Sequence, residues 1–160
     1  MKFKEFKNSE QADYDVANIK EGTTDNDNII STIKSLRGLR SLTPATNDEI
    51  AEAEKQLALL FCEDFKQYLS EFGAIYSEEV ELKGIAKTKG YNVVEFTNMV
   101  REVSPTIPKD FYVVSETEYN HIVICQNEKG LIYEWRNNDN AVYVSPSLAQ
   151  YIKTKKKNLK

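Results

Sequence analysis

The stretch TNDEIAEAEKQLALLFCEDFKQYLSEFG, residues 46–73, decides the expected fold, because it predicts two amphipathic helices separated by a short break. Thr46 and Glu49 form a T-x-x-E capping box, in which each side chain bonds a backbone N–H at the start of a helix. Apolar residues then recur at the spacing of one helix face. They are Ile50, Ala53, Leu57 and Leu60.

The second helix of this stretch begins after a break at residues 62–64. Its apolar face is expected to contain Phe65, Tyr68, Leu69 and Phe72. Gly73 follows directly, and glycine is the residue that most readily takes the left-handed conformation that ends a helix. Taken alone, residues 46–73 predict a helical hairpin of a kind that is common in the cores of many folds.

Further helices are expected on both sides of the hairpin. Asp27 or Asn28 caps a helix through residues 29–36, which Gly38 ends. Asn92 caps another helix, and the residues of its apolar face are Val93, Phe96, Val100 and Val103. Residues 75–86 differ in pattern, because apolar and acidic side chains are interspersed there. This stretch predicts a short strand or loop with an acidic edge.

The last third of the chain predicts a series of strands, at residues 111–115, 121–126, 131–136 and 141–145. The turn at 127–130 ends in glycine and is expected to join the second and third strands as a hairpin. Ser145 and Pro146 then open a closing helix, with serine as the cap and proline in the first turn. The inward face of this helix contains Leu148, Tyr151 and Ile152.

These elements indicate a single α+β domain with N-terminal helices, an antiparallel sheet of about four to six strands and a C-terminal helix. We divide the chain into a lead-in with one helix (1–40), the domain proper (41–153) and a basic tail (154–160). Residues 1–28 contain only scattered apolar side chains, so they predict a loosely ordered segment.

Charge is distributed unevenly along the chain. The net charge is −4, but five lysines lie at or beyond Lys153, which leaves 16 basic residues against 25 acidic ones elsewhere. An acidic body suits a basic protein partner, because complementary charge raises the encounter rate. Solubility alone is the competing explanation. The lysine tail could contact RNA or a membrane, but a solvated helix end is the simpler interpretation.

The sequence gives no support for catalytic or cofactor chemistry. Cys62 and Cys125 are distant and form no C-x-x-C motif, so neither a disulfide framework nor a metal site is indicated. The six glycines form neither G-x-G-x-x-G nor a P-loop, so we expect no cofactor. His121 and Cys125 would lie about 13 Å apart along one strand, too far for a catalytic dyad.

Two further expectations concern location and the only tryptophan. The N-terminus has no apolar h-region, so we expect a cytoplasmic protein without a membrane span. Tyr133 and Trp135 share one face of a strand. Exposed, they would be a binding hot spot; we favour burial, because a central strand fills a core readily with aromatic side chains.

The order of these motifs resembles the SUKH superfamily. The resemblance includes a helix of the form I-x-x-A-E-x-x-L at residues 50–57, and an acidic-aromatic helix that ends in Phe72-Gly73. A glycine in a short strand follows at Gly84 and a V-V-x-x-T helix at 93–97. The motifs P-x-D-F, G-x-I-Y-x-W and a closing Tyr-Ile come last, at residues 108–111, 130–135 and 151–152.

The match extends from about Leu42 to Ile152, and two departures fall in its first half. Family members often have proline where Cys62 stands and a second glycine where Ala74 stands. Residues 1–40 have no counterpart in the family pattern.

The resemblance implies an immunity protein that binds and neutralises a secreted bacterial toxin, commonly a nuclease, by covering its active site. A nuclease cleft is positive because it holds phosphates, so an acidic binder is expected on charge alone. Our candidate contact residues, chosen by charge and expected exposure, are Tyr76, Glu78, Glu79, Glu81, Glu116 and Glu118. Neither direct nucleic-acid binding nor enzymatic activity is expected.

A regulatory scaffold is the alternative, because other members of the superfamily resemble proteins that bind signalling partners without neutralising them. Residues 1–40 would then serve as a docking arm. Deletion of residues 1–28 would separate the two functions, since an immunity core should keep its toxin affinity without them.

Overall fold

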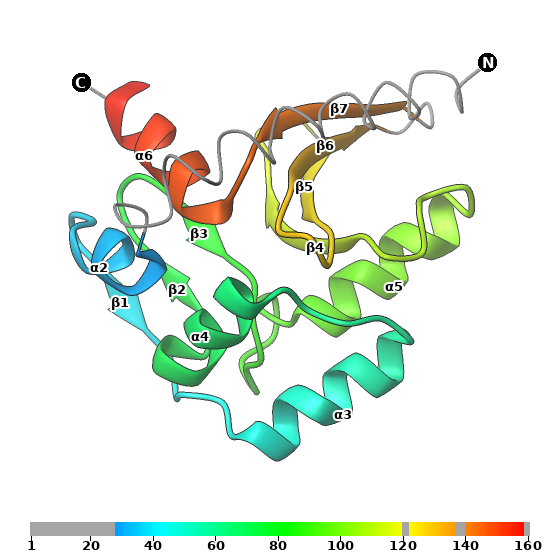
Figure 1. The fold of residues 1–160 in the computed structure, drawn as a ribbon, viewed down its shortest axis with the longest axis horizontal. Coiled ribbons are helices and arrows are strands. Elements are labelled where there is room, and N and C mark those ends of the chain that lie inside the picture. The colour runs from blue at the N-terminus through cyan, green and yellow to red at the C-terminus, as the bar shows by residue number, and fades with distance from the viewer. Residues whose placement is uncertain (1–27, 120–121, 137–139, 159–160) are drawn as a thin grey trace.

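The computed structural model describes residues 28–119, 122–136 and 140–158 of the chain (Figure 1). The elements in chain order are α2 (Ile29–Lys34), β1 (Arg40–Ser41), α3 (Asn47–Leu57), α4 (Glu63–Phe72), β2 (Ile75–Tyr76), β3 (Glu81–Leu82), α5 (Val93–Val103), β4 (Tyr112–Glu116), β5 (Ile122–Gln126), β6 (Ile132–Arg136), β7 (Asn140–Ser145) and α6 (Leu148–Asn158). This order confirms the expected α+β class. The expectations for residues 1–27, for His121 and for the turn at 137–139 lie outside the described residues.

The helical hairpin of residues 46–73 is present as α3 and α4. Thr46 Oγ1 accepts the N–H of Glu49 at 3.1 Å, and Glu49 accepts the N–H of Thr46 at 2.9 Å, so the capping box is confirmed. Gly73 ends α4 with a positive φ of 73°, but its ψ of −66° lies outside the left-handed helical conformation that we expected. Leu60 was wrongly assigned to the first helix face. Ala58 turns into the left-handed conformation and ends α3, which leaves Leu60 57% exposed.

The strands form two antiparallel sheets. The small sheet has the order β1-β2-β3, and the large sheet is the meander β4-β5-β6-β7. The turn between β5 and β6 forms as predicted: Gly130 donates to the carbonyl of Asn127, and the Asn127 side chain accepts the N–H of Leu131. The two sheets meet where the N–H of Lys83 donates to the carbonyl of Val114 at 2.8 Å.

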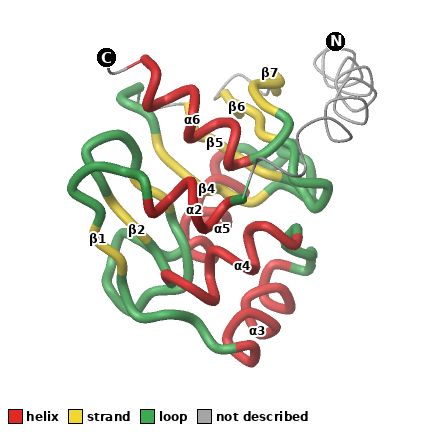
Figure 2. The backbone as a smooth tube through the Cα atoms, turned by 60° about the vertical axis from the view of Figure 1, so that its left-hand side comes forward, coloured by secondary structure: helices red, strands yellow, loops and turns green. Residues whose placement is uncertain are grey.

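Each face of the meander has its own apolar core. Tyr112, Val114, Ile124 and Ile132 point into the larger core, which they share with the apolar faces of α2, α3, α4 and α6. The opposite face points into a smaller core that contains Val113, Cys125, Tyr133 and Trp135 and is covered by α5. Tyr133 and Trp135 are therefore buried, as we favoured. Figure 2 shows the helices on either side of the strands.

The flanking helices follow the predicted pattern with local differences. Asn28, not Asp27, caps α2 by accepting the N–H groups of Ile30 and Ser31. Asn92 caps α5 in the same way. The apolar face of α5 ends earlier than predicted, because Val103 is exposed at the last turn.

The closing helix begins later than the sequence indicates. The predicted cap at Ser145 is wrong: Ser147 Oγ accepts the N–H of Gln150, while Ser145 Oγ donates to the carbonyl of Ser147. Pro146 therefore precedes the helix. At the other end, α6 continues to Asn158, and Lys156 Nζ donates to Ser35 at 2.7 Å, which holds this part of the basic segment against the end of α2.

Candidate partner-binding groove

A groove of about 730 Å³ lies where β3, the ends of β4, β5 and β6, and α6 come together. Carboxylates dominate its lining, and they come from separate parts of the chain: Glu79, Glu81, Glu116, Glu118 and Glu134. Arg136 and Lys155 are the basic residues of the lining among the described residues. The fold thus gathers acids that are up to 55 positions apart in sequence around one depression.

Four of the six candidate contact residues meet in this groove. Glu81, Glu116 and Glu118 are exposed there, and Glu79 lines it as well. Tyr76 and Glu78 lie outside the groove lining. The Tyr76 ring lies 6.3 Å from the Tyr91 ring, measured between centroids.

The expectation that Glu79 is exposed is wrong. Its side chain is only 2% exposed, and its carboxylate accepts the backbone N–H of Arg37 at 2.9 Å and the Arg37 Nε–H at 3.2 Å. Burial alone would raise the pKa of the Glu79 carboxyl, but the hydrogen bonds and charge of Arg37 outweigh burial, and the pKa lies below its ordinary value. Glu79 therefore fixes the loop before β3 to the end of α2.

Lys83 is a residue that the sequence did not single out. Its side chain is 2% exposed, and its ammonium donates to Glu116 at 3.1 Å and to the carbonyl of Gly90 at 2.7 Å. Glu81 lies 3.5 Å away, and the Phe96 ring centroid 3.9 Å away. A buried ammonium needs such partners because desolvation is costly. Lys83 thereby holds two groove carboxylates from different sheets in fixed positions.

The remainder of the lining also escaped the sequence analysis. Glu134 pairs with Arg136 at 2.8 Å. Tyr119 is exposed at the rim, and its backbone is held by the side chain of Thr117. Tyr151 lies at the floor, where burial and the charge of Glu134 raise the pKa of its hydroxyl to about 12. Strand alternation in the sequence places Glu134 on the face opposite Tyr133 and Trp135, but no local pattern indicates that this face borders a groove.

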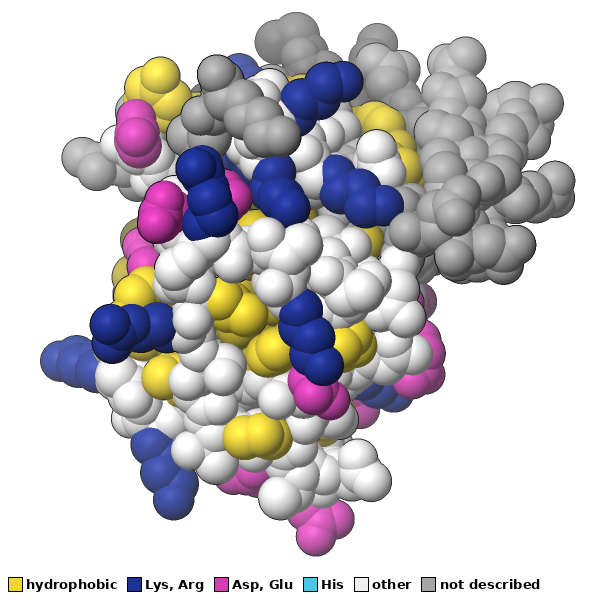
Figure 3. All heavy atoms as spheres, turned by 90° about the vertical axis from the view of Figure 1, so that its left-hand side faces the viewer, with side chains coloured by type: hydrophobic (Ala, Val, Ile, Leu, Met, Phe, Trp, Pro, Cys, Tyr) yellow, Lys and Arg dark blue, Asp and Glu magenta, His cyan; other side chains and the backbone are white. Residues whose placement is uncertain are grey.

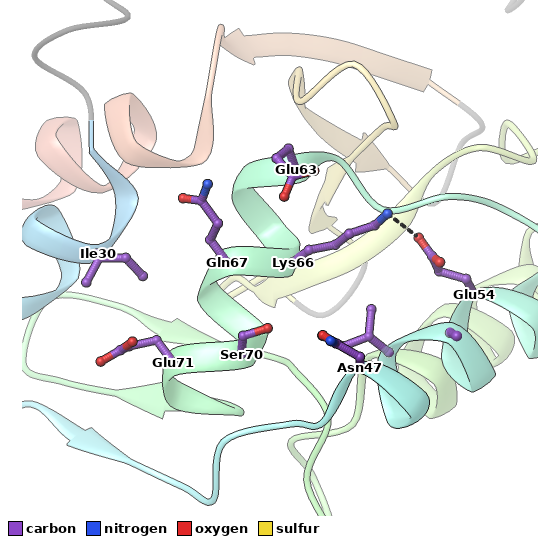
Figure 4. A pocket seen from close by; sticks show the side chains of 10 residues that line it. Ile30, Asn47, Glu54, Glu63, Lys66, Gln67, Ser70 and Glu71 are labelled. Carbon is purple, nitrogen blue, oxygen red and sulfur yellow. Dashed lines mark ion pairs between the residues drawn. The ribbon is translucent and has the colours of Figure 1, made fainter.

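A second hollow of about 510 Å³ lies between α2, α3 and α4 (Figure 4). Its walls are mixed: Glu54 and Lys66 form an ion pair at 3.4 Å, and Asn47, Gln67 and Ser70 line the rest. The Glu54 carboxylate also accepts the backbone N–H of Phe61. The Glu54–Lys66 ion pair joins α3 to α4, so ordinary helix packing accounts for this hollow. The acidic groove is therefore the better candidate site.

The face formed by α2, α6 and β1 is different in character. Figure 3 shows Lys and Arg side chains spread over much of this face, with acidic side chains mainly near its margins. The net negative charge of the chain is therefore distributed unevenly over the surface.

The described residues contain no group of three or more His, Cys, Asp or Glu side chains arranged to hold a metal ion. Both cysteines are buried and unbridged, and burial raises the pKa of each thiol. Among the described helices, none is both long and apolar enough to cross a membrane.

Comparison with known proteins supports the fold. A crystal structure of a protein from Pseudomonas syringae pv. tomato superposes with a TM-score of 0.60 at 14% identity, over 78% of this chain and 93% of that one. At this identity the likeness concerns the fold alone. No curated protein sequence matches the chain.

The family model SUKH_5, described as SMI1-KNR4 cell-wall, matches residues 26–156. The match includes α2 as well as the part of the chain in which the sequence motifs were found, and it spans both sheets and both cores. The chain belongs to the SMI1-KNR4 family of the SUKH superfamily.

Proposed function

We propose that this protein is an immunity protein, which binds a basic protein toxin through the acidic groove and blocks the toxin's active site. It acts by binding alone, in the cytoplasm of the cell that must be protected, and a nuclease is the favoured class of toxin. Family membership supports a binding role, and the groove supplies the surface through which binding would occur.

The gathering of carboxylates in one groove is the observation that carries this proposal. A nuclease domain must present positive charge to hold the phosphates of its substrate. An inhibitor that faces this charge with carboxylates covers the cleft and is also steered toward it, which raises the association rate. Glu81, Glu116 and Glu118 are exposed and line the same groove, so they can meet such a surface together.

The rim also offers a residue of the kind that anchors interfaces. Tyr119 is a large exposed aromatic side chain next to Glu118. Tyrosines are enriched among residues that dominate binding energy, because the ring buries much surface and the hydroxyl keeps a hydrogen bond. We therefore add Tyr119 to the contact surface and remove Glu79, whose carboxylate is already bound to Arg37.

The first experiment is a pull-down from the source organism with the full chain as bait, followed by co-expression of the recovered partner. The proposal expects a secreted toxin with a basic C-terminal domain, whose toxicity is relieved by this protein. Recovery of signalling or cell-wall proteins without any toxic activity would instead favour the scaffold function and contradict the proposal.

Charge reversal then tests the groove itself. The double variant Glu81→Lys and Glu118→Lys should slow toxin association by about tenfold at low salt, and the difference should shrink at high salt, because salt screens exposed charges. The matched control is Glu102→Lys and Glu128→Lys, two exposed acids outside the groove lining. Equal effects of the two double variants would assign the result to net charge and remove the groove from the proposal.

A further inference from the structure

The two edges of the large sheet differ in how they are covered. At the β4 edge, the N–H of Val113 donates to Thr97 Oγ1 at 2.9 Å, and the carbonyl of Val114 accepts the N–H of Lys83. Among the described residues, no backbone hydrogen bond joins β7 to any element other than β6. Figure 1 shows β7 as the outermost strand of the meander. The described part of the chain therefore leaves the outer backbone groups of β7 without a strand to pair with.

β7 also lacks the features that usually protect a sheet edge. Natural edge strands are often very short, or they contain lysine or proline. β7 has six residues, Asn140–Ser145, with no charged residue and no proline, and residues 141–144 are a continuous apolar run. A register shift lies beside Val144, which is 38% exposed. The strand thus has the composition of a paired strand although it lies at an edge.

Charge indicates which strand suits this edge. The basic partner proposed for the groove would find no carboxylate on β7, and no residue of β7 lines the groove. β7 is instead complementary to itself, because two copies have equal length and bring no like charges together. Like charges directly opposite each other destabilise a sheet. For a chain with a net charge of −4, an uncharged strand is a segment at which two copies can meet.

Symmetry allows this pairing without disturbing either core. When a strand pairs antiparallel with its own copy, the twofold axis is perpendicular to the sheet, so each face continues into the same face of the other copy. The smaller core reaches the edge at Ala141, which is 6% exposed, and Tyr143 packs against this core. In the pair, the smaller cores of the two copies become neighbours along one face.

We propose that β7 pairs antiparallel with β7 of a second copy of this chain. The pairing joins two meanders into one sheet of eight strands, four from each copy, which is within the usual range for open sheets. Twofold dimers are also the commonest oligomers. Since β7 contributes nothing to the groove lining, the dimer goes beyond the proposed function and does not depend on it.

Sedimentation velocity of the full chain over about a hundredfold range of concentration tests the association. The sedimentation coefficient should rise to that of a dimer and then stay constant, because a twofold interface is closed. Added salt should strengthen the dimer or leave it unchanged, since backbone hydrogen bonds and apolar contacts form it and salt screens the repulsion between two acidic chains. A monomer at every concentration, growth beyond the dimer, or a dimer that salt dissociates would overturn the proposal.

Two exposed valines provide a matched pair of variants. Val144→Lys places a like charge at the interface in both copies and should weaken the dimer severalfold. Val103→Lys makes the same change in the last turn of α5, where Val103 is 72% exposed, and should leave the dimer unchanged. Equal weakening by the two variants would assign the effect to net charge and overturn the role of β7.

Isotope-filtered NMR locates the interface in the unaltered protein, so the proposal remains testable if Val144→Lys does not fold. Labelled chain is mixed with unlabelled chain, and nuclear Overhauser contacts between the copies should come from residues 141–144. Contacts between the groove of one copy and the α2 and α6 face of the other would indicate head-to-tail docking and overturn the proposal. Slow hydrogen exchange of all β7 amides in a protein that sediments as a monomer would show that the chain covers this edge itself, which would also overturn it.

Discussion

The ammonium of Lys83 lies 3.1 Å from a carboxylate oxygen of Glu116, although Lys83 follows the last strand of the small sheet and Glu116 ends the first strand of the large one. Nearby, Ser115 Oγ donates to the carbonyl of Glu81 at 2.7 Å. These contacts join the two sheets beside the groove. Stability and groove geometry are therefore coupled through one buried lysine.

Replacement of Lys83 by methionine should destabilise the protein by about 1–3 kcal/mol, because the carbonyl of the half-buried Gly90 loses its donor. The two glutamates are half exposed and can be rehydrated, so the loss should stay below that of a fully buried pair. Urea unfolding followed by the fluorescence of Trp135, the only tryptophan, measures the change. The exposed Lys87→Met is the control, and an equal loss there would contradict the role of Lys83.

Gly84→Ala should cost about 3 kcal/mol, at the upper end for an overpacked site. An added Cβ would overlap the carbonyl oxygen of Gly73, and this oxygen is held by the N–H of Ile85 and cannot easily move away. Gly90→Ala is the informative control, since it has a positive φ of 95° but open space around it. We expect about 1 kcal/mol there. Thermal or urea unfolding that ranked the two in the opposite order would show that steric overlap is not decisive.

The Glu79–Arg37 contact should make stability depend on pH in a defined direction. The pKa of Glu79 is lower in the folded protein than the ordinary 4.5, so the unfolded chain binds this proton at higher pH than the folded one does. The stabilisation is complete above pH 4.5 and is lost as the pH falls through the lower folded value. The free energy of unfolding, measured from pH 7 to pH 3 for wild type and Glu79→Gln, should therefore converge in acid. A constant difference would refute the linkage; Glu78→Gln, with an exposed side chain, is the control.

Thr46→Ala should destabilise the protein by about 1 kcal/mol, as is usual for the loss of an N-cap. The substitution removes the acceptor for the Glu49 N–H at the first turn of α3. Thr106→Ala, at an exposed position outside the helices, should leave the midpoint of urea unfolding nearly unchanged. Equal midpoints for Thr46→Ala and wild type would show that the capping box contributes nothing.

Neither thiol should react with Ellman's reagent in the folded protein. Burial raises the pKa of both Cys62 and Cys125, and the reactive species is the thiolate. In urea both should react within the time of unfolding, giving two equivalents per chain. Rapid release of one equivalent from the native protein would show that one cysteine is accessible after all.

Much of the local structure follows from the sequence because its causes are local. A capping box, an apolar face at helical spacing and a glycine-ended turn each involve residues within a few positions of one another. This explains why α3, α4, α5 and the hairpin of β5 and β6 were predicted. It also explains the errors. At Leu60 the apolar spacing continued after α3 had ended, and at Val103 it continued where α5 no longer packs against the core. At Ser145 the cap was placed two residues early.

The sequence by itself determined the helices, the strand order of the meander, the fold class and the family. The tertiary structure alone decided which carboxylates are available. Glu79 is hydrogen-bonded to Arg37, 42 positions away, and Lys83 fixes Glu116, 33 positions away. Exposure and pairing of a charged side chain depend on segments that are distant in sequence and meet only in the folded chain, and no local pattern encodes that meeting.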